Sequence, residues 1–211
     1  MVSPGTKIIV LLTALFCYLP LIGQVKGQLC DGDLLFCCTD TANAITAVTS
    51  GVEGLLIDHV GVVYRIGGDE APVFVIEAVK PAVCLTPIGD FLAENGTVLL
   101  GKVNVDIDVE ESVRRCLALV GKPYDDLYLP GDSAVYCSEL VQLCYVNTSG
   151  ELIFDTVPMS FHDESGKITD YWREFYGQRG MVVPEGEPGT NPGELSRRHQ
   201  ITIIGKYPSK L

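Results

Sequence analysis

The chain has 211 residues, with 27 Asp and Glu against 15 Lys and Arg, which gives a formal net charge of -12. This acidic balance argues against a binder of DNA, RNA or an anionic membrane surface, because such a protein needs a basic face. Hydrophobic residues make up 47% and charged residues 20%, so the chain has ample material for one folded core and no sign of disorder.

The N-terminus has the plan of a secretory signal peptide. Lys7 precedes an apolar run over residues 8–22, and the small residues Gly23 and Gly27 follow. The run is short for a spanning helix, which needs roughly 20 apolar residues. We therefore predict cleavage after Gly23 or Gly27, so that segment 1–27 is removed. Residues 28–211 then form a single exported domain, periplasmic or extracellular, without a membrane span. An uncleaved N-terminal anchor is the alternative.

The next part of the chain favours extended structure. Runs rich in apolar and β-branched residues predict strands over 33–36, 57–64, 73–79 and 97–105. Residues 67–69, Gly-Gly-Asp, supply the turn of a hairpin between the second and third of these strands. Between the first two strands, Ala and Val recur at helical spacing, which predicts a short helix over 41–49.

Helical periodicity begins at Val109 and ends at Gly121. A second helix begins near Cys137 and stops at 147–150, a loop rich in Pro and Gly covers 181–196, and a last strand covers 199–204. Because strands cluster first and helices come later, we predict an α+β domain with a mostly antiparallel sheet.

Seven of the eight cysteines remain after removal of residues 1–27: Cys30, Cys37, Cys38, Cys84, Cys116, Cys137 and Cys144. An odd number leaves at least one thiol unpaired within a monomer in an oxidising compartment. No pair has C-x-x-C spacing and the chain has only 3 His, so we predict neither a metal site nor a cofactor.

Cys137 is the candidate nucleophile. It lies in the first turn of a predicted helix, where the helix dipole and free backbone N–H groups favour thiolate over thiol and can receive an oxyanion. The alternative is a buried small hydrophobe or one half of a disulfide. A bond to Cys144 is excluded within an intact helix, since seven residues of helix rise about 10.5 Å.

His59 is the candidate partner of this cysteine. A strand histidine is more often structural, but Gly61 on the same strand face clears space beside it. The hairpin partner strand carries Glu77 among apolar residues, where an acid either points to solvent or has a charged partner. Asp58 is less suited to orient His59, because neighbours in a strand point to opposite faces. A Cys–His pair oriented by a third polar group is the arrangement for acyl transfer through a thiolate.

Two sequence blocks, HVGVVY at 59–64 and CSELV at 137–141, resemble the signature blocks of NlpC-type, papain-like cysteine peptidases. The cysteine block comes first in the standard family; the reversed order here resembles the circularly permuted branch, the YiiX/YebB-like hydrolases. Supporting blocks follow in the expected order, and the set covers most of the mature chain: 32–36, 75–78, 121–125 and 184–193. The resemblance implies a circularly permuted papain-like fold, with the sheet packed against helices and the catalytic cysteine at a helix N-terminus.

The resemblance also implies the roles of the site residues. Cys137 is the nucleophile, His59 the general base and then acid, and Glu77 the third polar residue. Tyr124 is a candidate hydroxyl lining the substrate cleft, with packing on Pro123 as the alternative. The chain departs from the standard branch at Tyr136, where that branch has an acid before the cysteine.

These residues predict an exported thiol hydrolase that cleaves an amide bond, first of all in a cell-wall peptide, through an acyl-enzyme on Cys137. The first alternative is a lipid acyl hydrolase or acyltransferase, because permuted relatives such as lecithin retinol acyltransferase move acyl groups; an apolar groove beside Cys137 would favour it. The second is a non-catalytic, disulfide-stapled binding protein. The expected partner is a small peptide or acyl substrate and no nucleic acid.

Overall fold

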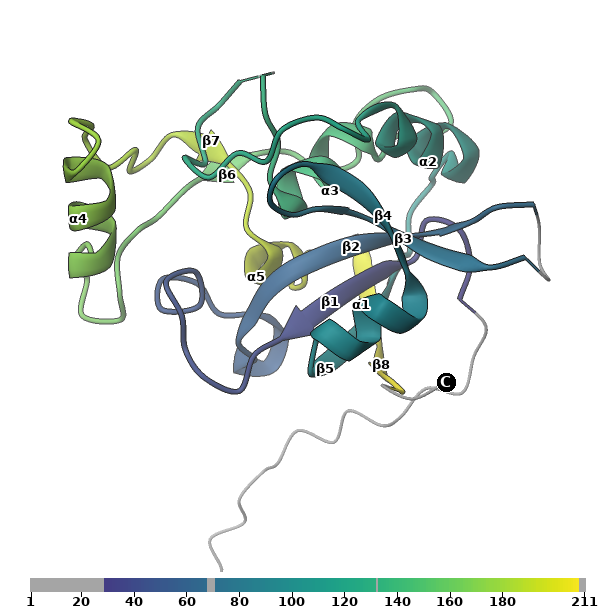
Figure 1. Ribbon diagram of the computed structural model, residues 1–211, viewed down its shortest axis with the longest axis horizontal. Coiled ribbons are helices and arrows are strands. Elements are labelled where there is room, and N and C mark those ends of the chain that lie inside the picture. Colours follow the sequence, from purple (N-terminus) through teal and green to yellow (C-terminus); the bar gives the residue numbers. More distant parts are fainter. Residues whose placement is uncertain (1–28, 68–70, 132, 209–211) are drawn as a thin grey trace, which may run out of the picture.

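A six-stranded antiparallel sheet is the centre of the computed structural model, which describes residues 29–67, 71–131 and 133–208 (Figure 1). The strands lie in the order β4-β3-β2-β1-β5-β8. Their bounds are Leu34–Cys38 for β1, Ile57–Arg65 for β2, Val73–Ala78 for β3, Val83–Pro87 for β4, Thr97–Val103 for β5 and Ile201–Tyr207 for β8.

Helices and short elements fill the connections between the strands. The helices are α1 at Ile88–Glu94, α2 at Val109–Ala118, α3 at Cys137–Cys144, α4 at Asp170–Gly177 and α5 at Pro192–Leu195. A single 3-10 turn, η1, covers Val52–Gly54, and the two-residue strands β6 (Val157–Pro158) and β7 (Pro188–Gly189) pair with each other. The order of strands and helices is that of the predicted α+β class, which the structure confirms.

Both faces of the sheet are covered, as the alternation along β1 shows. Leu34 and Phe36 pack in one cluster with α2 and α3, whereas Leu35 and Cys37 pack in a second cluster with Phe91 of α1. Residues that alternate along a strand point to opposite faces, so α3 and α1 lie on opposite sides of the sheet. This packing fixes the start of α3 against the middle strands.

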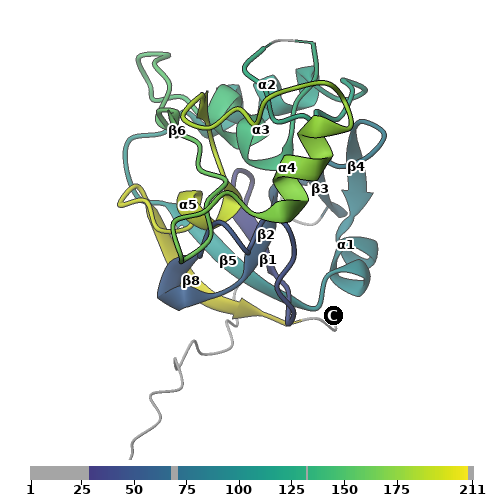
Figure 2. The same cartoon turned by 90° about the vertical axis from the view of Figure 1, so that its left-hand side faces the viewer.

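A third, smaller cluster packs around α4. This helix lies apart from the sheet in Figure 1 and toward the viewer in Figure 2. Phe161, Trp172 and Tyr176 are its buried aromatic residues. The Trp172 indole N–H donates to the carbonyl of Ala44 at 3.0 Å, and the Tyr176 hydroxyl donates to the carbonyl of Leu127 at 2.7 Å. These two hydrogen bonds tie two distant loops to α4.

The structure confirms the strands predicted in the first half of the chain and the helices predicted from Val109 and near Cys137, each with bounds shifted by a few residues. Strand β4 and helices α1 and α4 were not predicted. No helix of the described ranges is long and apolar enough to cross a membrane. The predicted signal peptide, residues 1–27, lies outside the described residues.

The predicted helix over 41–49 is wrong, because side chains there bind the local backbone instead. The Asn43 side-chain oxygen accepts from the N–H groups of Ile45 and Thr46, and the Thr46 hydroxyl accepts from the Asn43 N–H at 2.8 Å. Short polar side chains that bond to nearby backbone groups compete with helix formation. The segment therefore forms consecutive turns, and these turns contribute to the site described next.

Candidate active site

Cys137 is the first residue of α3, and the backbone before it fixes the start of the helix. Tyr136 is extended, with φ -106° and ψ 171°, and its N–H donates to the side chain of Glu139 at 3.4 Å. The first helical hydrogen bond runs from the N–H of Leu140 to the carbonyl of Tyr136. The N–H groups of Cys137 and Ser138 precede this bond, so they are available to a negatively charged atom at the helix end.

His59 and Glu77 meet across neighbouring strands. The His59 Nε2 atom lies 2.7 Å from a carboxylate oxygen of Glu77, and 16% and 6% of the two side chains are exposed. The other carboxylate oxygen accepts a short hydrogen bond from the hydroxyl of Thr86 on β4. Both oxygens of this buried acid therefore have a donor, which holds the carboxylate in one orientation against the imidazole.

Gly61 lies where β2 and β3 approach each other closely. A Cβ atom on Gly61 would lie 2.3 Å from Cγ1 of Val75 and 3.6 Å from Cβ of Glu77. Any side chain at this position would force β2 and β3 apart next to the contact between His59 and Glu77. The inference from the sequence that Gly61 clears space beside His59 stays a prediction, because the atoms nearest to this position belong to Val75, Phe91 and Glu77.

The electrostatics of His59 link the pair to the cysteine. Burial lowers the pKa of His59, but hydrogen bonds to Cys137 and Glu77, together with their negative charges, raise it to about 10. Since Glu77 contacts Nε2, the Nδ1 atom is left for the sulfur of Cys137. The three side chains form a chain of contacts, Cys137–His59–Glu77, in which the raised pKa of His59 favours the imidazolium.

The structure separates the two acids that sequence reasoning weighed for His59. Asp58 accepts a hydrogen bond from the side chain of Asn43 at 2.6 Å on the surface, whereas Glu77 contacts the imidazole. Asp58 on β2 thus pairs with the loop that follows β1 and not with the imidazole.

The two tyrosines that the sequence analysis singled out lie near this chain of contacts. The hydroxyl of Tyr124 is 3.4 Å from that of Tyr128, and burial raises the pKa of Tyr124. Tyr128 lines the cavity beside Cys137, whereas Tyr124 is not among the lining residues, so its substrate role stays a prediction. The hydroxyl of Tyr136 accepts from the N–H of Thr190 at 2.9 Å, which attaches the C-terminal loop to the start of α3.

Within the described part of the chain, Cys137 carries a free thiol, as do five other cysteines: Cys37, Cys38, Cys84, Cys116 and Cys144. Burial raises the pKa of Cys38 to about 11 and also raises the pKa of Cys116, so these two thiols stay protonated at neutral pH. Cys137 differs from them in its contact with His59.

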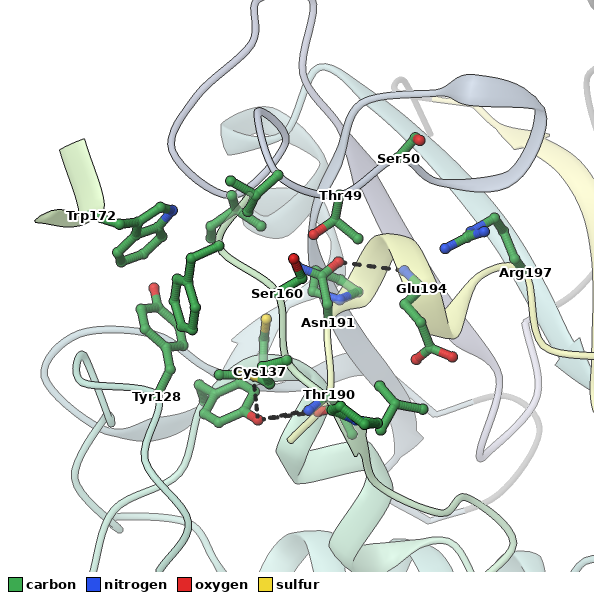
Figure 3. Close-up of a pocket in the computed structure, with 18 residues that line it drawn as sticks. Thr49, Ser50, Tyr128, Cys137, Ser160, Trp172, Thr190, Asn191, Glu194 and Arg197 are labelled. Atoms are coloured by element: carbon green, nitrogen blue, oxygen red, sulfur yellow. Dashed lines mark hydrogen bonds between the residues drawn. The ribbon is translucent and has the colours of Figure 1, made fainter. Parts of the chain in front are cut away.

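The sulfur of Cys137 faces a cavity of about 370 Å³ (Figure 3). Apolar and aromatic side chains form one part of its wall: Ile45, Val48, Tyr128, Val157, Pro158, Met159, Phe161 and Trp172. Polar and charged side chains form another part: Thr49, Ser50, Ser160, Thr190, Asn191, Glu194 and Arg197. Figure 3 shows Tyr128 and Trp172 on one side of Cys137, with Glu194 and Arg197 on the other.

Sequence reasoning missed most of this cavity wall, although two signals were present. Trp172 is the single tryptophan of the chain, and Asn191-Pro192 is a start signal for a helix. The Asn191 side chain indeed caps α5 by accepting from the N–H of Gly193 at 2.8 Å. Neither signal indicates by itself that these residues meet Cys137, because that meeting depends on the path of two long loops.

The fold and the arrangement around Cys137 define a class: a cysteine hydrolase with a circularly permuted papain-like fold. The family model described as "Permuted papain-like amidase enzyme, YaeF/YiiX, C92 family" matches residues 28–205. The chain belongs to this family, which confirms the predicted resemblance and the prediction of a cysteine hydrolase.

Two relatives from Escherichia coli agree with this assignment. The uncharacterized protein YiiX of strain K12 is 28% identical over 139 residues, which cover 63% of this chain and 67% of YiiX. A crystal structure described as that of metalloprotein YiiX from strain O157:H7 aligns with a TM-score of 0.68 at 23% identity. That alignment covers 86% of this chain and 100% of the other and shows the shared fold.

Proposed function

We propose that the protein hydrolyses an amide bond through an acyl-enzyme on Cys137, with His59 as general base and then acid. The observation that carries this proposal is the position of His59, whose pKa is raised by Cys137 on one side and by Glu77 on the other. Glu77 acts as a positioning residue, because it holds the imidazole by Nε2 and stabilises the imidazolium.

In the first step, the thiolate of Cys137 attacks the carbonyl carbon of the amide and forms a carbon–sulfur bond. The N–H groups at the start of α3 receive the developing oxyanion. The imidazolium of His59 then gives its proton to the nitrogen as the carbon–nitrogen bond breaks, and the amine leaves.

In the second step, water attacks the thioester while His59 removes its proton. The carbon–sulfur bond breaks, the carboxylic acid is released and the thiolate–imidazolium pair is restored. One amide and one water thus give one acid and one amine.

Two substrate classes are favoured by different observations. The family resemblance and the acidic chain favour a short cell-wall peptide, whose free amino group a negative surface attracts. The aromatic and aliphatic side chains beside Cys137 favour a lipid acyl group, as the alternative of a lipid acyl hydrolase or acyltransferase requires. In both cases we propose that residues 1–27 direct export and that the mature enzyme acts in the periplasm or outside the cell.

The relative YiiX is described as a metalloprotein, which raises the question of whether side chains of this chain could hold a metal ion. In the ranges that the structure describes, no group of three or more His, Cys, Asp and Glu side chains is arranged to hold a metal ion. The residues present therefore do not fit such a site, and the proposed steps use Cys137, His59 and the start of α3.

The test is mass spectrometry of products from two substrate panels, cell-wall-derived peptides and phospholipid or retinyl esters. We expect amide cleavage by the purified protein and none by Cys137→Ser, which keeps the size of the side chain. Intact-mass measurement of the protein during turnover should detect the acyl adduct on the residue 137 peptide. Ester cleavage without amide turnover would favour the lipid alternative, and products that do not depend on Cys137 would contradict the proposed site.

A further inference from the structure

The edge strand β4 brings two polar side chains to the buried acid of the site. In the antiparallel pair of β3 and β4, Cys84 lies directly opposite Glu77, and Thr86 lies two residues further along β4. Residues two apart in a strand share one face of the sheet, so the three side chains are neighbours on that face. The hydroxyl of Thr86 is hydrogen-bonded to Oε1 of Glu77, and the sulfur of Cys84 lies 3.5 Å from the same hydroxyl.

The direction of these two hydrogen bonds follows from the carboxylate. An ionised carboxylate only accepts hydrogen bonds, so the single proton of the Thr86 hydroxyl points toward Glu77. The hydroxyl oxygen is then an acceptor for Cys84, whose S–H group donates to it. Donation therefore runs one way, from Cys84 through Thr86 to Glu77, and the thiol favours the orientation of the hydroxyl that serves the acid.

The surroundings of Glu77 make this donor important. The Glu77 side chain is 6% exposed, and the buried ring of Phe91 on α1 lies 6.1 Å from the ring of His59, centroid to centroid. A buried carboxylate oxygen that loses its donor is costly. Without the Thr86 hydroxyl, the carboxylate would turn toward water or take up a proton, and either change weakens the contact of Oε2 with His59.

The other groups that face His59 leave Glu77 as the partner through which β4 acts. Cys137 contacts the imidazole from α3, and Cys37 lies opposite His59 on β1. Burial raises the pKa of the Cys37 thiol well above its usual range, so this thiol is neutral. Asp58 is hydrogen-bonded to Asn43 on the surface. A change on β4 therefore reaches the imidazole through the carboxylate.

We propose that Thr86 and Cys84 are positioning residues, which extend the chain Cys137–His59–Glu77 by two hydrogen bonds and hold the carboxylate of Glu77 toward the imidazole. The inference rests on the proposed function and adds two residues of β4 to its machinery. During the reaction, they keep the imidazolium of His59 formed and directed while the thiolate attacks the amide.

The test is an NMR titration of the histidine side chains from pH 6 to 11, in which His162 and His199 are internal references. We expect Thr86→Val to lower the pKa of His59 from about 10 to about 9, a tenfold loss of proton affinity. Thr86→Ser keeps the hydroxyl and should restore the pKa. Cys84→Ala should give a smaller fall, which Cys84→Ser should reverse because a serine hydroxyl also donates.

The matched control is Thr202→Val on β8, the opposite edge strand of the same sheet. The Thr202 hydroxyl accepts a hydrogen bond from the side chain of Asn104 at 2.8 Å, so this change also removes a hydroxyl and its hydrogen bond. It should leave the pKa of His59 unchanged. The double variant Glu77→Gln/Thr86→Val should show the same pKa of His59 as Glu77→Gln alone, because Thr86 acts through the carboxylate.

Turnover of the cell-wall-derived peptides gives a second measurement. We expect kcat to fall about 3- to 10-fold in Thr86→Val while KM is nearly unchanged, since the lost hydrogen bond bears on proton transfer. Thr86→Ser should recover kcat as it recovers the pKa of His59.

Three results would overturn the inference: an unchanged pKa of His59 in Thr86→Val, no recovery in Thr86→Ser, or a further fall in the double variant. An unchanged pKa in Cys84→Ala would overturn the role of Cys84. The titration needs no substrate, so the expected shifts without Cys137-dependent turnover would support the positioning role and remove the proposed function. Cys137-dependent turnover with a His59 titration that ignores Thr86→Val would leave the proposed function standing and the inference wrong.

Discussion

The paired strands β2 and β3 and the loops that line the cavity contribute different parts of the same site. The strands hold His59 and Glu77 by the register of the sheet, by Gly61 and by the hydrogen bond from Thr86 on β4. The cavity wall is instead assembled from the 41–49 turns, residues 157–161, α4 and the segment 190–197, joined by side-chain hydrogen bonds such as that from Trp172 to Ala44.

The strands thus hold the residues that transfer protons, whereas the loops hold the residues that contact the substrate. Groups that transfer protons need fixed geometry, which a sheet supplies through many backbone hydrogen bonds. Groups that select a substrate can lie on loops, which tolerate changes in sequence and length without loss of the fold. We therefore expect changes in the strands to alter kcat and its pH dependence, and changes in the loops to alter KM.

Among changes in the strands, we expect Glu77→Gln on β3 to have the largest effect on kcat. The amide keeps the shape of the side chain but removes the charge that stabilises the imidazolium, so we expect kcat to fall about 100- to 1,000-fold. Because the pKa of His59 is raised to about 10, the protonated imidazole of the unchanged protein persists until about pH 10 and activity falls above it. In Glu77→Gln this alkaline limb should move toward lower pH.

The measurement is kcat from pH 6 to 11 for both proteins, with Glu174→Gln on the exposed surface of α4 as the control that removes an acid elsewhere. An unchanged alkaline limb in Glu77→Gln, despite slower turnover, would show that Glu77 acts only on the fold.

The loop side predicts a smaller effect, in Trp172→Phe. This change removes the hydrogen bond to Ala44 and part of the cavity wall, and we expect it to cost about 1–2 kcal/mol of stability. KM should rise several-fold while kcat is nearly unchanged, since His59 and Glu77 lie on other elements. Steady-state kinetics check this, with Tyr171→Phe as control because Tyr171 is 52% exposed and does not line the cavity. A loss confined to kcat would break the division between strands and loops.

The smallest expected effect is on the pH dependence of stability, through Glu139 in the first turn of α3. Burial raises the pKa of Glu139 from 4.5 to about 7. Between these two pH values the carboxyl is protonated in the folded protein but ionised in the unfolded chain. Stability therefore falls as pH rises through this window and is lowest, for this group, above pH 7. Glu139→Gln should raise the free energy of unfolding by about 1–2 kcal/mol at pH 8 and by much less at pH 5.

Denaturant unfolding at the two pH values measures this difference. An equal gain at pH 5 and pH 8 would mean that the carboxylate of Glu139 carries no burial penalty.

Many of the strands and helices could be predicted from the sequence, because local patterns of residues determine them. The β-branched run around His59 and the apolar spacing after Val109 each predict an element that the structure contains. The contact between His59 and Glu77 was also predictable, since hairpin strands place residues on one face side by side.

The cavity wall was not predictable in the same way. Asn43 and Thr46 turn an apparent helix into turns by bonding the backbone, and α4 meets Ala44 only through tertiary contacts across more than a hundred residues. Arg197 lies in a turn whose sequence carries no periodic signal, so its place on the cavity wall could not be predicted. Such relations depend on the folded path of the chain.

Activation of Cys137 by His59 can be measured as the rate at which iodoacetamide alkylates Cys137 at pH 7, determined separately for each cysteine-containing peptide. The half-buried Cys38, whose pKa is raised to about 11 by burial, is an internal reference in the same protein. We expect Cys137 to react faster than every other thiol, and His59→Ala to slow the alkylation of Cys137 at least about tenfold while the rate for Cys38 is unchanged. Equal rates for Cys137 in the two proteins would contradict the activation of Cys137 by His59.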